Sequence, residues 1–396
     1  MTVIIGTEAR FWRASDGSVR SETEGRSFSF WCRYLAVFES VVVFARVTAN
    51  GDGGGFRVDG PGVSVWPVAD YLGFRGLVTE FRQIKYQAAR VIATYPGPVI
   101  GRLPGPVSSI LIAAARRQGV PYGAEVVGDP KGVLASGAPP GTAALLGGWT
   151  ATHMRRQCRR ANAVAYVTRE FLQHRYPASL DAVTAHYSSV ELNEDAYARS
   201  TRTYSALNTP RLITIGSVAQ RYKGVDVLVS AVAGLASAGT RVELRVLGEG
   251  RYLSELRTQA HQLGVDRQIQ FLGRVSMTRV RKELDEADLF VLASRTEGLP
   301  RALLEAMARA LPAVGTGVGG IPELLDHAQL VSPNDSEALA DAIAEVIRDP
   351  PLMTALSRRN LAVARDYSTT ELTIRRDAFY RELRAITLRD EESQPD

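Results

Sequence analysis

The sequence predicts an α/β protein in which two doubly wound, Rossmann-like domains face each other across a cleft. Its 396 residues, 45% hydrophobic and 22% charged, are typical of a globular chain with two or three packed domains. Short apolar runs alternate with stretches of helical periodicity in both halves. A polar stretch without periodicity divides them near residues 193–210. We therefore expect an N-terminal domain at residues 1–195 and a C-terminal domain at residues 205–366.

The second half shows the cleaner strand and helix pattern. "RLITIG" predicts a strand, residues 225–235 carry one apolar helix face, and "VELRVLG" resumes a strand, which together make a βαβ unit. Further strands are expected at "IQFLG", "DLFVLA", "PAVGTG" and "AQLVS", with helices at 251–263, 276–286, 300–310 and 336–348. Six strands with helices between them predict a parallel, doubly wound sheet.

The first half alternates in the same way, and a final helix follows the second domain. Strands are expected at "TVIIG", "SVVVFAR", "VSVWPV", "GPVIGR", "YGAEVVG" and "NAVAYVT". They predict a second parallel sheet. Residues of about 368–388 show helical spacing of apolar side chains.

Composition and charge limit the partners. No apolar run approaches the roughly 18 to 20 residues of a membrane span, and the start lacks a secretion signal, which predicts a cytoplasmic protein. Cys32 and Cys158 belong to no C-x-x-C pair or metal-binding pattern, so we expect them to be buried free thiols. The net charge is +5, but no nucleic-acid motif occurs, so a nucleic-acid partner is not expected. The basic run "HMRRQCRRANA" leaves two interpretations open, a solvated helix face and peripheral contact with the inner membrane face.

The stretch "SRTEGLPRALLEAMA" carries two glutamates separated by seven residues. Glu297 lies in the loop after a strand, and Glu305 lies in the second turn of a helix that we expect to begin at Pro300. Amides of Gly298 and Leu299 at a helix N-terminus suit phosphate oxygens. Glu297 would then face sugar hydroxyls and Glu305 a ribose, so the spacing suits a nucleotide sugar. The alternative is a loop charge and an ordinary helix former.

Other loops that follow strands carry weaker signals. Lys223 stands just ahead of an amphipathic helix, where a cation could meet a diphosphate. "GEG", which begins at Gly248, and "VGGIPEL" follow two further strands. Each of these signals is weak alone because glycines often only make turns. No D-x-D pair follows a strand, so no metal site is expected.

Taken in order, "GS…YKGVDVL", "VLGEG", "FLGRV", "RTEGLPRALLEAMA" and "GVGGIPELL" resemble the donor domain of family 4 glycosyltransferases, in the subgroup that reads GS…YKG. The resemblance covers Arg211 to Leu325. It implies the GT-B fold and a retaining transfer of a sugar from a nucleotide-diphosphate sugar to an acceptor hydroxyl, in polysaccharide, glycolipid or natural-product biosynthesis. It implies no cofactor and no metal, and a C-terminal helix that packs back on the first domain. Oligomeric state, sugar, base and acceptor stay open.

The resemblance also implies roles for individual residues. Lys223 would bind the diphosphate, Glu297 the donor sugar and Glu305 the ribose. The donor site would be completed by backbone and neighbouring groups at Ser217, Gly248, Gly273, Arg274, Val275, Gly298, Leu299 and Pro300.

Two departures from the family pattern affect the site. An arginine often follows the first glycine of the donor domain, but here Ser217 follows Gly216, and Arg221 is the candidate for the second cation. On the acceptor side many members have a histidine where this chain reads "GAEVVGDP", with Val127 in its place. Glu125 has two open interpretations, functional or paired inside the wall of the cleft. Asp129 is expected in an exposed loop and is the predicted catalytic carboxylate on the acceptor side, where it would orient the acceptor.

Two other classes of function remain as alternatives. One is a sugar-nucleotide epimerase-like enzyme of the same architecture, and the other is a binding protein without chemistry. A dehydrogenase fits poorly because no strand is followed by G-x-G-x-x-G with an acidic residue about 20 positions later.

Overall fold

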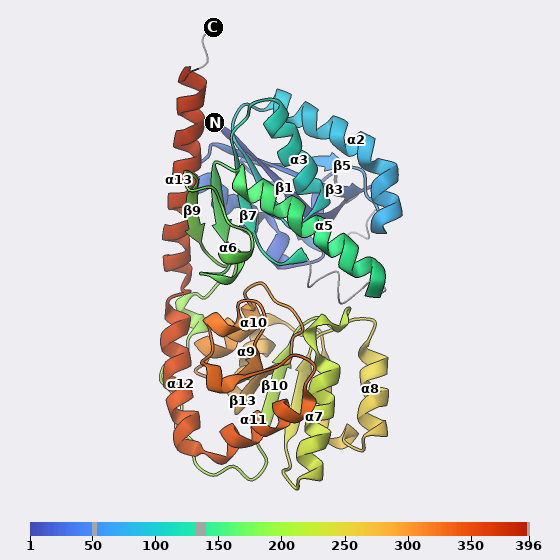
Figure 1. Cartoon of the computed structure of the whole chain (residues 1–396), viewed down its shortest axis with the longest axis vertical. Coiled ribbons are helices and arrows are strands. Elements are labelled where there is room, and N and C mark those ends of the chain that lie inside the picture. Colours follow the sequence, from blue (N-terminus) through green and yellow to red (C-terminus); the bar gives the residue numbers. More distant parts are fainter. Residues whose placement is uncertain (50–53, 131–139, 394–396) are drawn as a thin grey trace.

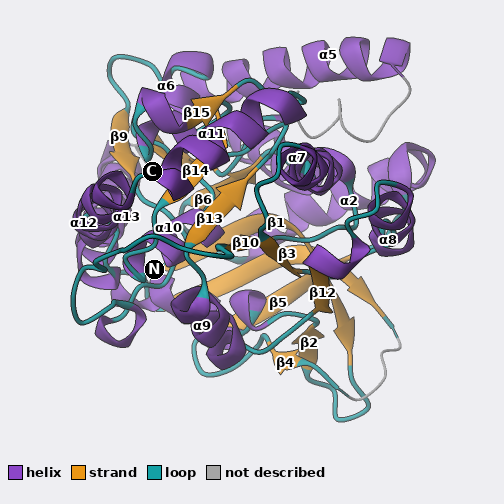
Figure 2. Cartoon of the chain, turned by 90° about the horizontal axis from the view of Figure 1, so that it is seen from below, coloured by secondary structure: helices purple, strands orange, loops and turns teal. Residues whose placement is uncertain are grey.

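A computed structural model describes residues 1–49, 54–130 and 140–393. Two α/β domains lie end to end, and a long C-terminal helix runs along the edge of the first (Figure 1). Seen along the long axis, helices surround the central strands (Figure 2). The expected two-domain α/β fold is therefore confirmed.

The N-terminal sheet is centred on a long first strand. Along the main path the strand order is β4-β2-β1-β6-β7-β8-β9, and β3 pairs with both β1 and β5. All pairings are parallel except β1 with β2 and β2 with β4, a short antiparallel extension that the sequence did not predict. The strands are β1 (Thr2–Arg13), β2 (Val19–Ser21), β3 (Ser40–Thr48), β4 (Phe56–Arg57), β5 (Val63–Val68), β6 (Val99–Leu103), β7 (Tyr122–Val126), β8 (Ala163–Tyr166) and β9 (Val183–His186).

Helices cover this sheet because its strands are apolar on both faces. Val3 and Ile5 of β1 pack into one core while Ile4 packs into another on the opposite face, as expected for a buried parallel strand. Pro106 begins its helix at the position where a missing N–H costs nothing. The helices of this domain are η1 (Glu24–Arg26), α1 (Phe28–Trp31), η2 (Cys32–Ala36), α2 (Gly73–Thr94), α3 (Pro106–Arg117), α5 (Pro140–Arg159) and α6 (Phe171–Arg175).

The C-terminal sheet is parallel throughout. Its order is β12-β11-β10-β13-β14-β15. Successive strands are added on one side of β10 as far as β12 and then on its other side from β13, so the strand order switches between β10 and β13. This is the doubly wound order in which ligands bind at the carboxyl ends of the strands. The six strands lie where the sequence predicted them: β10 (Arg211–Ile215), β11 (Glu243–Leu247), β12 (Ile269–Gly273), β13 (Leu289–Leu292), β14 (Ala313–Thr316) and β15 (Leu330–Val331).

The helices of the second domain begin at recognisable caps. The Asp335 and Asp349 carboxylates accept bonds from backbone amides three residues on, each at 2.9 Å, and fix the starts of two helices. The helices are η4 (Arg221–Lys223), α7 (Val225–Ser237), α8 (Leu253–Gln262), α9 (Met277–Glu286), α10 (Arg301–Ala308), η6 (Ile321–Glu323), α11 (Ser336–Arg348) and α12 (Pro350–Arg365), with short turns η3 (Glu194–Ala196), η5 (Asp266–Gln268) and η7 (His327–Gln329) between elements.

The last helix, α13 (Thr369–Ser393), returns to the first domain. It packs against β8, β9 and η2, and Phe379, Tyr380 and Leu383 are buried there. Figure 1 shows α12 along the second domain and α13 continuing along the first. One hydrophobic core runs through this crossing from the first domain into the second.

The carboxyl ends of the two sheets meet between the domains. A Cβ atom on Gly298, after β13, would lie 2.5 Å from the carbonyl oxygen of Val127, after β7, so only glycine permits this approach. The Glu323 carboxylate accepts bonds from the amides of Arg169, Glu170 and Phe171 at 2.6 to 3.2 Å. The loops predicted to carry the chemistry therefore lie at the domain boundary.

Candidate active site

The loops that follow the C-terminal strands are joined by backbone hydrogen bonds. Gly216 donates to the Leu247 carbonyl at 2.9 Å, Gly248 to Gly273 at 2.9 Å, and Gly320 to Gly298 at 2.7 Å. Because parallel strands end at the same edge, these bonds bring the loops after β10, β11, β12, β13 and β14 to one edge of the sheet.

Lys223 and Glu297 form an ion pair at this edge. Lys223 Nζ lies 2.7 Å from Glu297 Oε1, and Ser294 Oγ donates to the same oxygen at 2.7 Å. Both side chains are mostly buried, at 16% and 8% exposure. A Cβ atom on Gly216 would lie 3.2 Å from the side chain of Lys223. Glycine at this position therefore leaves room for the lysine side chain to reach Glu297. The two residues predicted to meet the diphosphate and the sugar are thus side by side.

Arg295 holds the loop that carries Lys223, a role that the sequence did not reveal. Its guanidinium binds both oxygens of Asp226, at 2.9 and 2.7 Å, and its amide donates to the Tyr222 carbonyl at 2.7 Å. Burial alone would raise the pKa of Asp226, but the hydrogen bonds and charge of Arg295 outweigh it, and the pKa is lowered. Asp226 precedes Arg295 by 69 positions, so only the fold shows that they pair.

Glu305 lies in the second turn of α10 without a partner. Its carboxylate is half-buried, and no described residue gives it a hydrogen bond or an ion pair. Burial raises its pKa, which the charges of Arg301 and Arg281 oppose only in part. A desolvated carboxylate without donors is suited to accept them from a ligand.

The start of α10 differs slightly from the prediction. Pro300 was expected as the first helical residue, but its backbone is extended and α10 begins at Arg301. The buried Leu299 packs into the core. Among the described residues, none accepts a hydrogen bond from the amides of Gly298 and Leu299.

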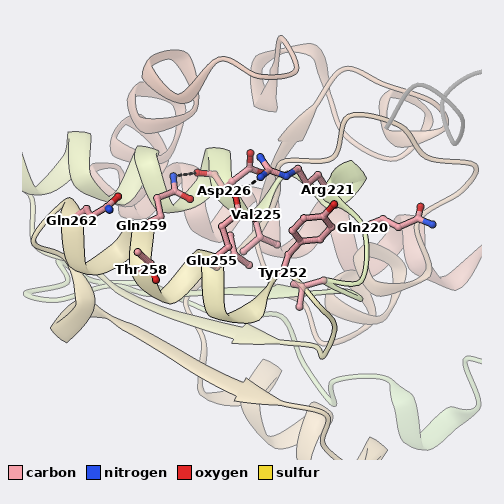
Figure 3. A pocket seen from close by; sticks show the side chains of 11 residues that line it. Gln220, Arg221, Val225, Asp226, Tyr252, Glu255, Thr258, Gln259 and Gln262 are labelled. Atoms are coloured by element: carbon pink, nitrogen blue, oxygen red, sulfur yellow. Dashed lines mark hydrogen bonds and ion pairs between the residues drawn. The ribbon is translucent and has the colours of Figure 1, made fainter. Parts of the chain in front are cut away.

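Arg221 does not join Lys223 and Glu297. Its guanidinium forms an ion pair with Glu255 of α8 and lies over the Tyr252 ring, 5.1 Å from the centroid. It lines a pocket of about 430 Å³ beside α7 and α8, where Figure 3 shows it beside Asp226 and Tyr252. Two residues apart in η4, Arg221 and Lys223 thus contact different neighbours.

The remaining residues predicted for the donor site serve their own loops or the domain boundary. Ser217 Oγ accepts from the Ala219 amide at 3.2 Å. Arg274 reaches Glu22 of the first domain at 3.3 Å. Val275 is half-buried against the core, and Gly273 ends β12 with a φ of 68°. The structure places Gly273–Val275 at the domain boundary, after β12, which β11 and β10 separate from the strand that precedes Glu297.

On the acceptor side, Asp129 is not exposed as the sequence predicted. Its side chain is buried, the Tyr176 hydroxyl donates to it at 2.5 Å, and Arg175 Nε lies 2.9 Å away. The expectation failed because Asp-Pro indicates a loop but not what covers it, and here α6 does. Val127 is 36% exposed at the boundary.

Glu125 is a charge paired inside the wall of the cleft, the second of the two interpretations of the sequence. The hydroxyls of Tyr34, Tyr187 and Tyr380 donate to it at 2.9 to 3.1 Å, and Arg102 and Arg33 provide the charges. Burial alone would raise its pKa, but the arginines and hydroxyls outweigh it, and the pKa is lowered.

Comparison with known proteins agrees with this geometry. Residues 201–362 match the family described as "Glycosyl transferases group 1". CapJ of Staphylococcus aureus is 24% identical over 326 residues, 81% of this chain and 80% of CapJ. A GDP-mannose-dependent alpha-(1-6)-phosphatidylinositol monomannoside mannosyltransferase of Mycobacterium tuberculosis is 28% identical, over 49% of this chain and 52% of that protein.

Solved structures share the whole fold. Sucrose-phosphate synthase of Thermosynechococcus elongatus superposes with a TM-score of 0.75 at 16% identity, covering 98% of this chain and 100% of that one. HepE of Anabaena, solved with UDP-glucose, gives 0.65 at 15% identity, covering 98% and 100%. The protein therefore has the GT-B fold of these structures, and its second domain matches the group 1 glycosyltransferase family. In the described residues no helix is long and apolar enough to cross a membrane.

Proposed function

We propose that the protein transfers a sugar from a nucleotide-diphosphate sugar to an acceptor hydroxyl, with retention of anomeric configuration. The carrying observation is the Lys223–Glu297 pair beside the unpartnered Glu305, all within the group 1 domain. The UDP-glucose bound by HepE and the GDP-mannose dependence of the mycobacterial relative support a nucleotide sugar.

The donor would extend from the loop after β12 to the start of α10. The base would lie near Gly273–Val275, the ribose hydroxyls would donate to Glu305, and the amides of Gly298 and Leu299 would meet phosphate oxygens. Glu297 would orient the sugar. Lys223 would turn part of its contact from Glu297 to the diphosphate, where negative charge develops as the glycosidic bond breaks.

The acceptor half supports a transfer without an enzymic base. Both carboxylates near the end of β7, Glu125 and Asp129, already hold protein partners. In a retaining transfer the leaving phosphate itself can take the proton of the acceptor hydroxyl.

We also propose that the reaction needs neither a cofactor nor a metal ion, because Lys223 and the amino end of α10 would meet the phosphate charge. Activity should persist in excess EDTA. Loss of activity in EDTA that magnesium restores would overturn this part of the proposal.

A thermal-shift screen of nucleotide sugars tests the donor. A ligand at 100 times its dissociation constant stabilises a protein by about 2.7 kcal/mol, which raises the melting temperature measurably. We expect one UDP- or GDP-sugar to do so. No shift with any nucleotide sugar would refute the proposal, and turnover of the donor without an acceptor would favour an epimerase-like enzyme.

Peripheral membrane contact is proposed through α2 and the residue before it. Leu72, Phe74, Val78 and Phe81 are 47 to 73% exposed there, and Arg75 is exposed beside them. Exposed apolar side chains flanked by basic ones fit a surface of anionic lipids. Co-sedimentation with anionic vesicles should fall when Phe74 and Phe81 become serine, but not for Leu180→Ser, a matched change at an exposed loop. Equal sedimentation of all variants would exclude this surface.

A further inference from the structure

Two arginines without partners approach each other across the domain boundary. Arg26 lies in η1 of the first domain, and Arg301 is the first residue of α10 in the second. Arg301 Nη1 lies 3.9 Å from the position of a Cβ atom on Gly25, the neighbour of Arg26. Among the described residues, neither guanidinium has a hydrogen bond or an ion pair.

The neighbouring arginines are matched by acceptors. Arg102 and Arg33 bind Glu125, and Arg46 donates to the carbonyls of Glu8 and Tyr71. Arg274 pairs with Glu22, which lies four positions before Arg26. Arg26 and Arg301 are exposed at the domain boundary and form no ion pair with a described carboxylate, although the charges of Glu22 and Glu305 act on them from farther away.

Electrostatics agrees with this geometry. Partial desolvation by the surrounding protein, followed by the charges of Arg102 and Arg301, lowers the pKa of Arg26. Like charges held close together raise the free energy of the unliganded protein, and the charge of Glu22 offsets this effect only in part. An anion between them would reverse this effect.

The position on α10 indicates which anion. Arg301 stands one turn before Glu305 and four residues after Glu297, so it belongs to the proposed donor site. Lys223 is already paired with Glu297, and Arg221 with Glu255, so a phosphate would find its uncompensated positive charge at Arg301 and Arg26. The planar fork of arginine matches phosphate oxygens.

We propose that Arg26 and Arg301 together bind one phosphate group of a substrate between the two domains. The inference rests on the proposed function. The phosphate has two possible sources, the diphosphate of the donor and a phosphate carried by the acceptor. In either case one arginine from each domain holds it, so the bound phosphate links the domains.

Calorimetry with inorganic pyrophosphate tests the pair at fixed ionic strength. We expect Arg26→Gln and Arg301→Gln each to weaken binding by about tenfold or more, the loss of one charge-assisted contact. Arg251→Gln, an exposed arginine over Tyr252, is the matched control and should change binding less than twofold. Wild-type affinity in Arg26→Gln or Arg301→Gln would overturn the proposal.

Thermal unfolding of the same variants separates binding from architecture. Removing one of two unpaired like charges should leave the melting temperature of the unliganded protein unchanged or higher, while the rise caused by pyrophosphate shrinks. A lower melting temperature with an undiminished pyrophosphate effect would make the arginines structural and refute the proposal. Arg301→Lys, which keeps the charge but loses the fork, should fall between wild type and Arg301→Gln.

UDP and GDP distinguish the two sources of phosphate. If the variants weaken nucleoside diphosphate binding by the same factor as pyrophosphate, the phosphate belongs to the donor. If phosphate still binds beside saturating nucleoside diphosphate, and the variants lose that binding, it belongs to the acceptor. Failure of the nucleotide-sugar screen would refute the proposed function, whereas the pyrophosphate result tests the arginine pair by itself.

Discussion

Glu125 in the first domain and Glu305 in the second are both surrounded by protein and both lie near arginines, yet they differ in what their oxygens contact. Glu125 accepts from three tyrosine hydroxyls and the Arg102 guanidinium, and it forms a further ion pair with Arg33. Glu305 accepts from none of the described residues. The pKa is accordingly lowered at Glu125 and raised at Glu305. Burial alone therefore does not distinguish a carboxylate that is paired within the protein from one whose oxygens are open to a ligand.

The difference follows from the cost of burying charge. An uncompensated buried charge costs several kcal/mol, so a permanently buried carboxylate needs permanent partners. Glu125 has such partners from η2, β6 and α13. These contacts attach the returning helix α13 to the sheet. Glu305 bears part of that cost in the unliganded protein, and a ligand with hydroxyl donors would relieve it.

The largest effect is expected on the free energy of unfolding, when Glu125 is replaced. Glu125→Gln leaves two arginines facing a neutral group and should cost about 3 to 5 kcal/mol of unfolding free energy at pH 7, measured in urea. Because its folded pKa lies below the ordinary 4.5, its stabilisation is present above that value and is lost as pH falls through the folded pKa. The variant should lose this acid dependence. Glu345→Gln, at an exposed site on α11, is the control, and equal stability of both variants would contradict the network's role.

Lys223 should show the next largest effect, this time on turnover. Lys223→Ala removes the cation proposed for the leaving diphosphate, and kcat should fall by about 10²- to 10³-fold. The stability of the folded state should change less than in Glu125→Gln, because Glu297 loses the Lys223 charge but keeps the hydrogen bond from Ser294. Lys282→Ala on α9, an exposed lysine, serves as control. Full turnover in Lys223→Ala would remove it from the chemistry.

Glu305→Gln should weaken nucleotide binding, whereas Glu125→Gln should lower stability. We expect weaker nucleoside diphosphate binding by roughly 10- to 150-fold, the loss of a charged hydrogen bond of about 1.5 to 3 kcal/mol, without loss of stability. The folded pKa of Glu305 is raised, so its favourable contribution is present below 4.5 and is lost as pH rises through the folded value. Calorimetry and thermal unfolding measure the two effects. Unchanged nucleotide affinity would sink the ribose assignment.

The sequence predicted what depends on local pattern. Periodicity located the C-terminal strands, and the order of strand and loop placed Glu297 and Lys223 at one edge, where they form a pair. The predicted helix at 368–388 occurs as α13 and contacts the first domain.

What the sequence could not predict depends on distant contacts. The partners of Glu125 come from positions up to 255 residues away, and the direction of Arg221 depends on Glu255 in another helix. The antiparallel strands β2 and β4 have only three and two residues, too short for a period to appear. The approach of Arg301 to Gly25 likewise depends on how the two domains are arranged, which local pattern does not predict.

The smallest expected effect is at Asp129, where the structure reverses the expectation from the sequence. Asp129→Asn keeps an oxygen that accepts from the Tyr176 hydroxyl and loses the charge toward Arg175, whose side chain is 32% exposed. Solvent screens that pair, so the loss of stability should be about 1 kcal/mol. Sugar transfer at saturating donor and acceptor should stay within about threefold of wild type, since a change below 0.7 kcal/mol in the barrier is expected for a residue that contacts no substrate. Tyr176→Phe, which removes the hydroxyl that donates to the carboxylate, should resemble Asp129→Asn in both measurements. A tenfold or greater loss of transfer in Asp129→Asn, with stability and Tyr176→Phe unaffected, would show that the carboxylate reaches the acceptor and that the covering α6 moves during the reaction.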